Sequence, residues 1–388
     1  MTESLIAYNS IDLEAQLMRD KSESWYKKDL LSTESWDKIK AHYTINFYTP
    51  NVFMRIGSFI FCTVLIYALL LLFTISSSDR AFALLIPYWA LIIGIISIVF
   101  LEFIIPSKKH YKSGIDDALL YCGLGFIISS LAYLMDLNPE KLTFYCFFIP
   151  VLIIAAIRYL DGLITIIAYC FALIIVVLMT MKLPKIAALI LPFMTMLFAI
   201  ITYLITLKIQ NKIALRFWKN NVDIIEGLSL ITFYAGGNYF IIQKANEMYF
   251  NNPIVSLPYL FWAFTFIVPL LYIYQGLKQK NRLILSVGLL SIAMGVATFR
   301  NYFHVMPLEI AAIIGGAILL AIAYFAIKYL KNNKTPFTYD EEADQKPFYQ
   351  QAESLIIAQT FGNQQGQNEG KPLFGGGDFG GGGAGQEF

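Results

Sequence analysis

Four polar side chains interrupt one of the long apolar stretches of the chain. They are Ser229, Thr232, Tyr234 and Asn238. A hydroxyl or amide group that faces lipid loses its hydrogen-bonding partners, so we expect these side chains to face the interior of a helix bundle. The neighbouring Gly236-Gly237 pair would loosen the helix, as in the broken helices that line transporter cavities. The pattern predicts part of the wall of a ligand cavity.

A second candidate group consists of Arg300, His304 and Glu309, where one apolar stretch ends and the next begins. The turn through Pro307 should bring the two helix ends together, with Arg300 in reach of a charge-assisted pair with Glu309. This pair could clamp two helices in register. Alternatively it could bind an anion or gate the mouth of the cavity, with His304 adding pH sensitivity near neutrality.

The remaining ionisable residues lie near the ends of the apolar stretches, where charged side chains reach the membrane surface and fix topology. At the ends expected to be cytoplasmic, these are Glu102, Asp116, Asp117, Arg158, Asp161, Asp223 and Glu226. The sequence has no nucleophile elbow, P-loop, H-E-x-x-H motif or histidine cluster, and its four cysteines lack the spacing of metal ligands. We therefore expect no enzyme, no cofactor and no metal site.

Long apolar helices must position these residues. Apolar residues make up 57% of the 388 residues and charged residues only 14%, against roughly 25% in soluble proteins. Windows of about 20 residues, the length that crosses a hydrocarbon core, give ten spans. They cover residues 55–76, 81–105, 115–135, 142–157, 163–181, 186–207, 222–242, 255–275, 283–303 and 308–329. The expected fold class is all-α, a polytopic helical membrane protein.

The distribution of Lys and Arg predicts the orientation of these spans. With ten crossings, 23 of the 29 basic residues lie on one side, which the positive-inside rule places in the cytoplasm together with both termini. Residues 222–242 form the weakest span, because they include Asp223 and Glu226, and a helix lying on the membrane surface is the alternative. Without that span, every later basic loop would lie on the wrong side, so the asymmetry favours a crossing.

Composition divides the chain into three parts. Residues 1–52 predict a cytoplasmic helical segment, residues 53–330 the transmembrane domain, and residues 331–388 a linker, a short helix and a flexible Gly/Phe-rich tail. In the first part, Ser10 and Ser32 are the expected N-caps of two helices. The second of these helices would carry an apolar stripe of Trp36, Ile39, Tyr43 and Phe47.

Short similarities four spans apart suggest a parallel repeat within the transmembrane domain. Pro150 and Pro269 occupy similar places in the fourth and eighth spans. Tyr-x-Gly occurs at Tyr121 in the third span and at Tyr234 in the seventh. An offset of four spans preserves the orientation of each span, so the repeat would be parallel and not inverted.

The run from Trp25 to Glu34, followed by Ile39, Tyr43 and directly by the first span, resembles the start of an uncharacterised family of bacterial multi-pass membrane proteins. Members of that family open with a short cytoplasmic segment of the kind G-L-[IL]-S-x-E and continue into many spans. Asp29 stands where the family often has Gly. The resemblance implies a bacterial inner (cytoplasmic) membrane and brings no catalytic residue with it.

Two functional hypotheses remain open. In the first, the chain is a small-molecule permease or a ligand-binding membrane protein, with the lipid bilayer and a small ligand as its partners. In the second, it is a membrane-embedded scaffold or sensor that presents the N-terminal helices and the Gly/Phe tail to cytoplasmic proteins. The absence of a charge near the middle of any span argues against ion-coupled transport. A net charge of +2 indicates no nucleic-acid partner.

Overall fold

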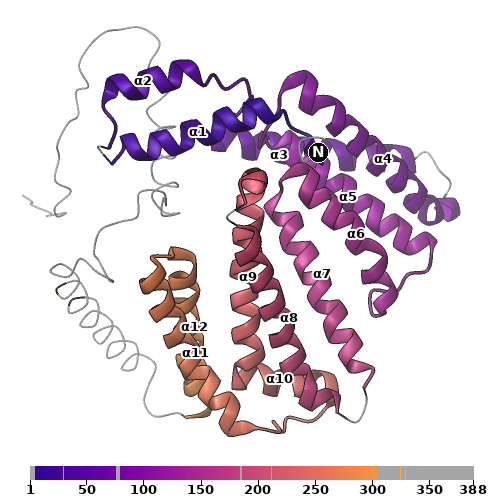
Figure 1. Ribbon diagram of the computed structural model, residues 1–388. Coiled ribbons are helices and arrows are strands. Elements are labelled where there is room, and N and C mark those ends of the chain that lie inside the picture. The colour runs from indigo at the N-terminus through magenta and orange to yellow at the C-terminus, as the bar shows by residue number, and fades with distance from the viewer. Residues whose placement is uncertain are drawn as a thin grey trace, which may run out of the picture. The chain divides into compact units, whose positions relative to one another are not determined.

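The computed structural model describes residues 5–28, 30–75, 79–183, 186–210 and 212–303, together with Tyr324 and Lys328. Within these ranges the chain is all-α (Figure 1). Eight of the described helices are long and apolar enough to cross a membrane. The predicted fold class is therefore confirmed, and the chain is a multi-pass membrane protein. The expected span at 308–329, apart from Tyr324 and Lys328, and the tail at 331–388 lie outside the described residues.

The helices of the bundle follow the predicted spans closely. They are α3 (Val52–Ile75), α4 (Asp79–Lys108), α5 (Ile115–Leu134), α6 (Leu142–Tyr159), α7 (Gly162–Met181), α8 (Ala187–Ile209), α9 (Lys219–Gly237), α11 (Pro258–Gln279) and α12 (Arg282–Tyr302). Two shorter elements connect them, the 3₁₀ helix η2 (Ile213–Trp218) and α10 (Tyr239–Phe250). The apolar run thus determines where each helix lies, because a backbone in lipid must satisfy its own hydrogen bonds.

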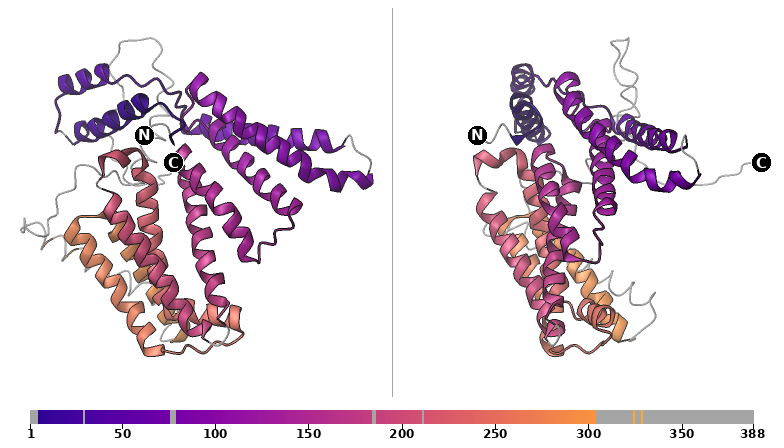
Figure 2. Two further views of the ribbon diagram at one scale, coloured as in Figure 1. Left: turned by 45° about the vertical axis from the view of Figure 1, so that its right-hand side comes forward. Right: turned by 90° about the vertical axis from the view of Figure 1, so that its right-hand side faces the viewer.

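The seventh predicted span is wrong at its C-terminal end, because the chain breaks there into two helices. Asn238 has extended backbone angles between α9 and α10, and its side-chain oxygen accepts a hydrogen bond from the backbone of Ile241. Two glycines followed by Asn favour such a break. Glycine destabilises the end of α9, and the Asn side chain can cap the helix that follows. Before the break, α9 packs against α7, α8, α11 and α12, and it runs beside α8 (Figure 1; Figure 2, left).

The N-terminal segment forms α1 (Ser10–Tyr26) and α2 (Thr33–His42). Ser32 caps α2 as expected, but the N-cap of α1 is Asn9, one residue before the predicted Ser10. The predicted stripe is also shortened, because α2 ends at His42 and none of its residues is buried. Phe47 lies beyond the helix and packs instead against Tyr8 and Tyr111.

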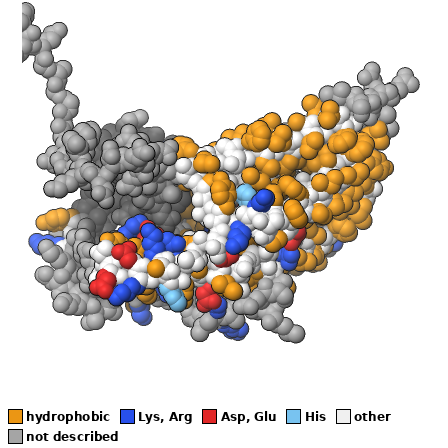
Figure 3. Space-filling view, turned by 90° about the horizontal axis from the view of Figure 1, so that it is seen from above, with side chains coloured by type: hydrophobic (Ala, Val, Ile, Leu, Met, Phe, Trp, Pro, Cys, Tyr) orange, Lys and Arg blue, Asp and Glu red, His pale blue; other side chains and the backbone are white. Residues whose placement is uncertain are grey.

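The segment before α1 packs onto one end of the bundle, which we call the rim. The rim is the end where α3, α5 and α7 begin and where α4, α6 and α8 end. The backbone N–H of Ala7 donates to the carbonyl of Arg158, at the end of α6, over 2.9 Å. Ile6, Tyr8 and Leu13 belong to the same apolar core as residues of α4, α5 and α6. Seen from this end, charged side chains gather over the N-terminal segment, whereas the flanks of the bundle are hydrophobic (Figure 3).

Candidate functional site

The four polar residues predicted on α9 are all buried. Asn238 has no exposed surface, and its amide donates to the hydroxyls of Tyr234, over 3.0 Å, and Thr298, over 3.1 Å. Thr232 accepts a hydrogen bond from the Tyr169 hydroxyl on α7 over 3.1 Å. Ser229 donates to the carbonyl of Glu226 within its own helix. These side chains therefore join α9 to α7 and α12 through hydrogen bonds.

A cavity of about 330 Å³ lies beside these residues, between α7, α8, α9 and α10. Thr232 lines it, together with Thr195, Gly236 and Asn246, and most of the remaining wall is apolar. Ser229, Tyr234 and Asn238 do not line it. A ligand-binding role for the four predicted residues stays a prediction.

Arg300 lies half-buried in the last turn of α12. Its two expected neighbours, His304 and Glu309, lie outside the described residues. The proposed clamp or gate at this end of the bundle therefore stays a prediction.

A polar cavity lies at the rim, at the opposite end of α9 from Asn238. Gly114 lies between the cavity-lining residues Lys112 and Asp116, has a φ of +90° and lies directly against α3. A Cβ at this position would lie 2.1 Å from the carbonyl oxygen of Arg55, so only glycine fits both the backbone angle and the close approach. This contact holds the first turn of α5 against α3.

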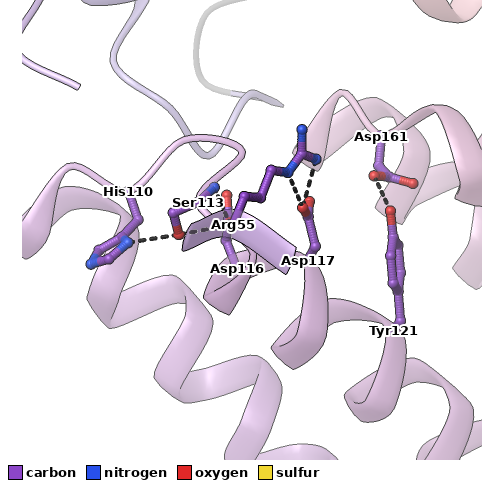
Figure 4. Close-up of polar contacts among 7 residues, drawn as sticks. All are labelled: Arg55, His110, Ser113, Asp116, Asp117, Tyr121 and Asp161. Carbon is purple, nitrogen blue, oxygen red and sulfur yellow. Dashed lines mark hydrogen bonds and ion pairs between the residues drawn. The ribbon is translucent and has the colours of Figure 1, made fainter. Parts of the chain in front are cut away.

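Two carboxylates of the rim already have partners (Figure 4). Arg55 donates to Asp117 Oδ2 from Nε over 3.0 Å and from Nη2 over 2.6 Å. Asp161 accepts from the Tyr121 hydroxyl over 2.8 Å, and its other oxygen caps α7 through the N–H of Ile164 over 2.8 Å. These bonds fix the side chains of the first turns of α5 and α7.

Among the described residues, Asp116 accepts hydrogen bonds at only one of its two carboxylate oxygens. Its side chain is buried, with 3% of its surface exposed, and Oδ1 accepts from the N–H of Ser113 over 2.8 Å and from its hydroxyl over 3.0 Å. Oδ2 has no hydrogen-bond partner among the described residues. A buried carboxylate oxygen without a donor is costly, so its environment favours an additional donor or positive charge.

His110 lies next to this arrangement, with Nδ1 2.7 Å from the Ser113 hydroxyl (Figure 4). Burial lowers the pKa of His110 below its ordinary value, and the charge of Lys108 acts in the same direction. The carboxylate of Asp116 opposes both by raising the pKa. The net shift favours a neutral imidazole, which can hold the Ser113 loop without adding charge.

The rim cavity is the space of about 230 Å³ enclosed by these groups. Its charged wall consists of Arg55, Lys112, Asp116, Asp117 and Asp161, one negative charge in excess. Its aromatic wall consists of Tyr8, Tyr111, Tyr121 and Tyr159. Burial raises the pKa of the Tyr8 phenol well above its ordinary value, so this ring stays neutral. The space is small, polar and bordered by four tyrosine side chains.

A second charged group strengthens the same end of the bundle. Arg158 donates to both oxygens of Glu102, over 2.5 and 2.6 Å, and the Tyr159 hydroxyl donates to Glu102 over 2.6 Å. The group joins α4 to the end of α6, and Ala7 binds the backbone of the same Arg158. The N-terminal segment is therefore held at the cavity by residues that also join the helices.

Among the described residues, no three His, Cys, Asp or Glu side chains come close enough to hold a metal ion. The carboxylates and tyrosine rings of the rim cavity are groups that can bind an organic ammonium ion. A carboxylate compensates its charge, and tyrosine faces attract it through their quadrupoles.

For the rim acids the sequence predicts only a role as charges that fix topology. Asp116, Asp117 and Asp161 are indeed at the helix ends, but the sequence does not show that α5 and α7 bring them to one cavity. One local signal was present, since Asp117 and Tyr121 are four residues apart and share a helix face. The role of Tyr8 depends on docking of the N-terminal segment, which no local pattern indicates.

No family model, no curated protein and no solved structure matches the chain. The resemblance of the segment around Trp25–Tyr43 to bacterial multi-pass membrane proteins stays a prediction.

Proposed function

We propose that this membrane protein binds a small organic cation in the rim cavity. The observation that carries the proposal is Asp116, which lines the cavity and whose buried Oδ2 has no hydrogen-bond partner among the described residues. An ammonium group would supply the missing positive charge. The excess of one carboxylate over the cations of the wall supports a cationic ligand over an anionic one.

The aromatic residues support the same ligand class. Tyr8 and Tyr111 meet edge to face with ring centroids 5.0 Å apart, and both line the cavity. Rings at such a site attract a cation by about 0.5–2 kcal/mol each, more when water is excluded. An inorganic cation would need several oxygen ligands converging on one point, whereas an organic ammonium ion is satisfied by one carboxylate and ring faces.

The N-terminal segment supports a binding or sensing role. Tyr8 belongs to this segment, and it forms part of the cavity wall. A ligand that contacts Tyr8 would therefore stabilise the docked segment, because binding to one state shifts the population toward that state. Occupancy of the cavity would in this way be transmitted to α1 and α2.

The proposal is tested by isothermal titration of the purified protein in lipid nanodiscs with choline and with its neutral analogue 3,3-dimethylbutan-1-ol. We expect choline to bind and the alcohol to bind at least about tenfold more weakly, since only the cation is attracted by the carboxylate of Asp116 and by the tyrosine rings, at about 0.5–2 kcal/mol per ring. Asp116→Asn should abolish this discrimination. Asp136→Asn, the same exchange at an exposed position outside the cavity, should leave it unchanged.

Equal binding of choline and the alcohol by the wild type would contradict the proposal, as would choline binding that survives Asp116→Asn. Uptake of labelled choline into proteoliposomes then distinguishes the two versions of the first hypothesis. A permease accumulates the label inside the vesicles, whereas a binding protein retains it only on the protein.

The scaffold hypothesis keeps one supporting observation. None of the residues of α2 is buried, and Trp36 in this helix stacks on Tyr26 of α1 with ring centroids 5.9 Å apart. An exposed amphipathic helix can bind a cytoplasmic protein through its apolar face. Replacing Trp36 and Ile39 by Ser should remove such a partner in a cross-linking experiment, while choline binding persists.

We place the protein in the inner membrane of a bacterium, with the rim facing the cytoplasm. The asymmetric Lys and Arg distribution supports the orientation, and the resemblance of the N-terminal segment supports the membrane. A cysteine at Gln279 should resist an impermeant thiol reagent added to intact cells, whereas one at Asn251 should react. The opposite labelling pattern would contradict this orientation.

A further inference from the structure

A third cavity, separate from the rim cavity, is an apolar groove of about 520 Å³. We call it the α6–α8 groove, because α6, α7 and α8 form most of its walls, with η2 and the first part of α9 closing its rim end. Ile153 on α6 and Ile205 on α8 border it and are 45% and 51% exposed. The groove therefore opens toward the outside of the bundle, where lipid surrounds a membrane protein.

The length of the groove corresponds to one leaflet of a bilayer. Along α8 its lining runs from Phe198 to Ile209, which is about 16 Å at about 1.5 Å per residue. Half of a hydrocarbon core of about 30 Å is about 15 Å. The lining reaches the rim at Ile209 and Trp218, so the groove covers the depth of the leaflet on that side.

Basic residues gather where the groove meets the rim. Residues 208–219 contain Lys208, Lys212, Arg216 and Lys219 and no acidic residue. The three lysines are exposed. Arg216 donates to Glu14 over 3.0 Å from Nη2, while its buried Nε has no partner among the described residues. Apolar groove residues alternate with these cations, among them Ile209, Leu215 and Trp218.

We propose that the α6–α8 groove binds one acyl chain of an anionic phospholipid, whose phosphate lies at the basic segment 208–219. The apolar lining suits the chain, the length suits one leaflet, and the excess of positive charge suits the headgroup. Trp218 lies at the boundary between the two, which is the position that tryptophan prefers at a membrane interface. A zwitterionic lipid would fill the same groove but would gain less from the cations.

The lipid would also support the N-terminal segment. Leu5 lines the groove, and Glu14 pairs with Arg216. A phosphate at segment 208–219 would bind near the ion pair between Arg216 and Glu14. The bound lipid would therefore contact the N-terminal segment, which also carries Tyr8. This inference stands independently of the ligand proposed for the rim cavity, because the two cavities share no lining residue.

The test is native mass spectrometry of the full chain released from vesicles with equal amounts of phosphatidylglycerol and phosphatidylcholine. We expect the wild type to retain phosphatidylglycerol in preference to phosphatidylcholine. Lys212→Gln combined with Lys219→Gln should reduce the preference by about fivefold or more, since a basic residue near an anionic headgroup contributes about that factor. Lys278→Gln with Lys280→Gln, in another basic loop, is the matched control and should keep the preference.

A second pair of variants tests the acyl-chain site. Ala172 lines the groove, so Ala172→Phe should fill it and remove the retained lipid. Ala297→Phe, at an exposed position on α12 outside the groove, should retain it. The proposal is overturned if the wild type retains both lipids equally, or if the exposed lysine pair can be removed without loss of preference. Retention of the lipid by a folded Ala172→Phe variant would also overturn it.

Discussion

The ring of Tyr8 packs edge to face against the ring of Tyr111, with centroids 5.0 Å apart. This contact joins the start of the chain to the loop between α4 and α5. The same Tyr111 ring stacks on Phe47, whose ring centroid lies 4.9 Å away. Tyr8 precedes α1 and Phe47 follows α2, so Tyr111 anchors both ends of the α1–α2 segment to the bundle. Docking of the N-terminal segment therefore supplies Tyr8 to the wall of the rim cavity.

Tyr8→Ala should release the N-terminal segment and weaken choline binding. Truncation of a buried aromatic residue costs about 3–5 kcal/mol, and Tyr8 is 8% exposed. Tyr8→Phe keeps the ring and should behave nearly as the wild type. Thermal unfolding in detergent and the rate of proteolysis within residues 5–28 measure the effect. Protection of the segment in Tyr8→Ala would contradict this account of docking.

Loss of the Arg55 guanidinium should destabilise the bundle more than loss of an exposed cation. Arg55→Gln leaves Asp117 without its cation, and the side chain of Asp117 is only 14% exposed, so we expect a loss of about 1–3 kcal/mol. Lys38→Gln removes the pair with Glu34, in which both side chains are more than 70% exposed. That control should cost less than about 0.5 kcal/mol. Denaturant titration compares the two, and equal losses would argue against a structural role for the rim pair.

Stability should fall as the pH falls from about 7 toward 5, because of His110. Its pKa in the folded protein lies below the ordinary value of about 6.5, chiefly through burial. In this window the unfolded chain binds more protons than the folded chain, so the free energy of unfolding rises with pH and is lost on acidification. The groups facing the ring are Asp116, Lys108, Ser113 and Tyr48.

His110→Gln removes the titrating group and should flatten the pH dependence between pH 5 and 7. Glutamine retains a side-chain amide that can contact Ser113. Unfolding midpoints of both proteins in the same detergent, measured across this pH range, provide the comparison. An unchanged slope in the variant would show that another group controls acid stability.

The positions of the helices could be predicted from sequence, and the cavities could not. Apolar length alone locates α3 to α8 and α11 to α12, since lipid leaves the backbone no alternative to a helix. Asp116 carries no such signal, because an acid at a helix end looks the same whether it faces water or an enclosed cavity. Its environment depends on α3, on α7 and on Tyr8, which are brought together only by tertiary packing.

The break at Asn238 shows a similar limit. Gly236, Gly237 and Asn238 indicated a weak point in the helix, and the expectation of buried polar residues agrees with the position of Asn238. A window of about 20 residues nevertheless extends the span across the break. The mean hydropathy of such a window stays high, because the apolar residues on both sides outweigh the polar Asn238. The extended backbone of Asn238 and the hydrogen bond from Ile241 to its side chain show that a second helix begins there.

Asn238 should be the polar residue of α9 whose replacement costs most. Its amide joins Tyr234 and Thr298, and its oxygen caps α10, all without solvent exposure. Asn238→Leu removes the cap and leaves both hydroxyls short of a partner, so we expect a loss of about 2–4 kcal/mol. Thr143→Leu, at an exposed position on α6, should change stability by less than about 0.5 kcal/mol.

A double-mutant cycle with Thr298→Val separates the cap from the hydrogen bond to α12. Once Asn238 is leucine, the Thr298 hydroxyl has lost one partner, and replacing it by an apolar group of similar shape should recover part of the loss. We therefore expect Asn238→Leu with Thr298→Val to be less destabilised than the sum of the single variants, by about 1 kcal/mol. The loss of stability that remains in the double variant measures the contribution of the Asn238 side chain as the N-cap of α10. Strict additivity of the two changes would mean that the contact between α9 and α12 contributes nothing, and that Asn238 acts through the helix break alone.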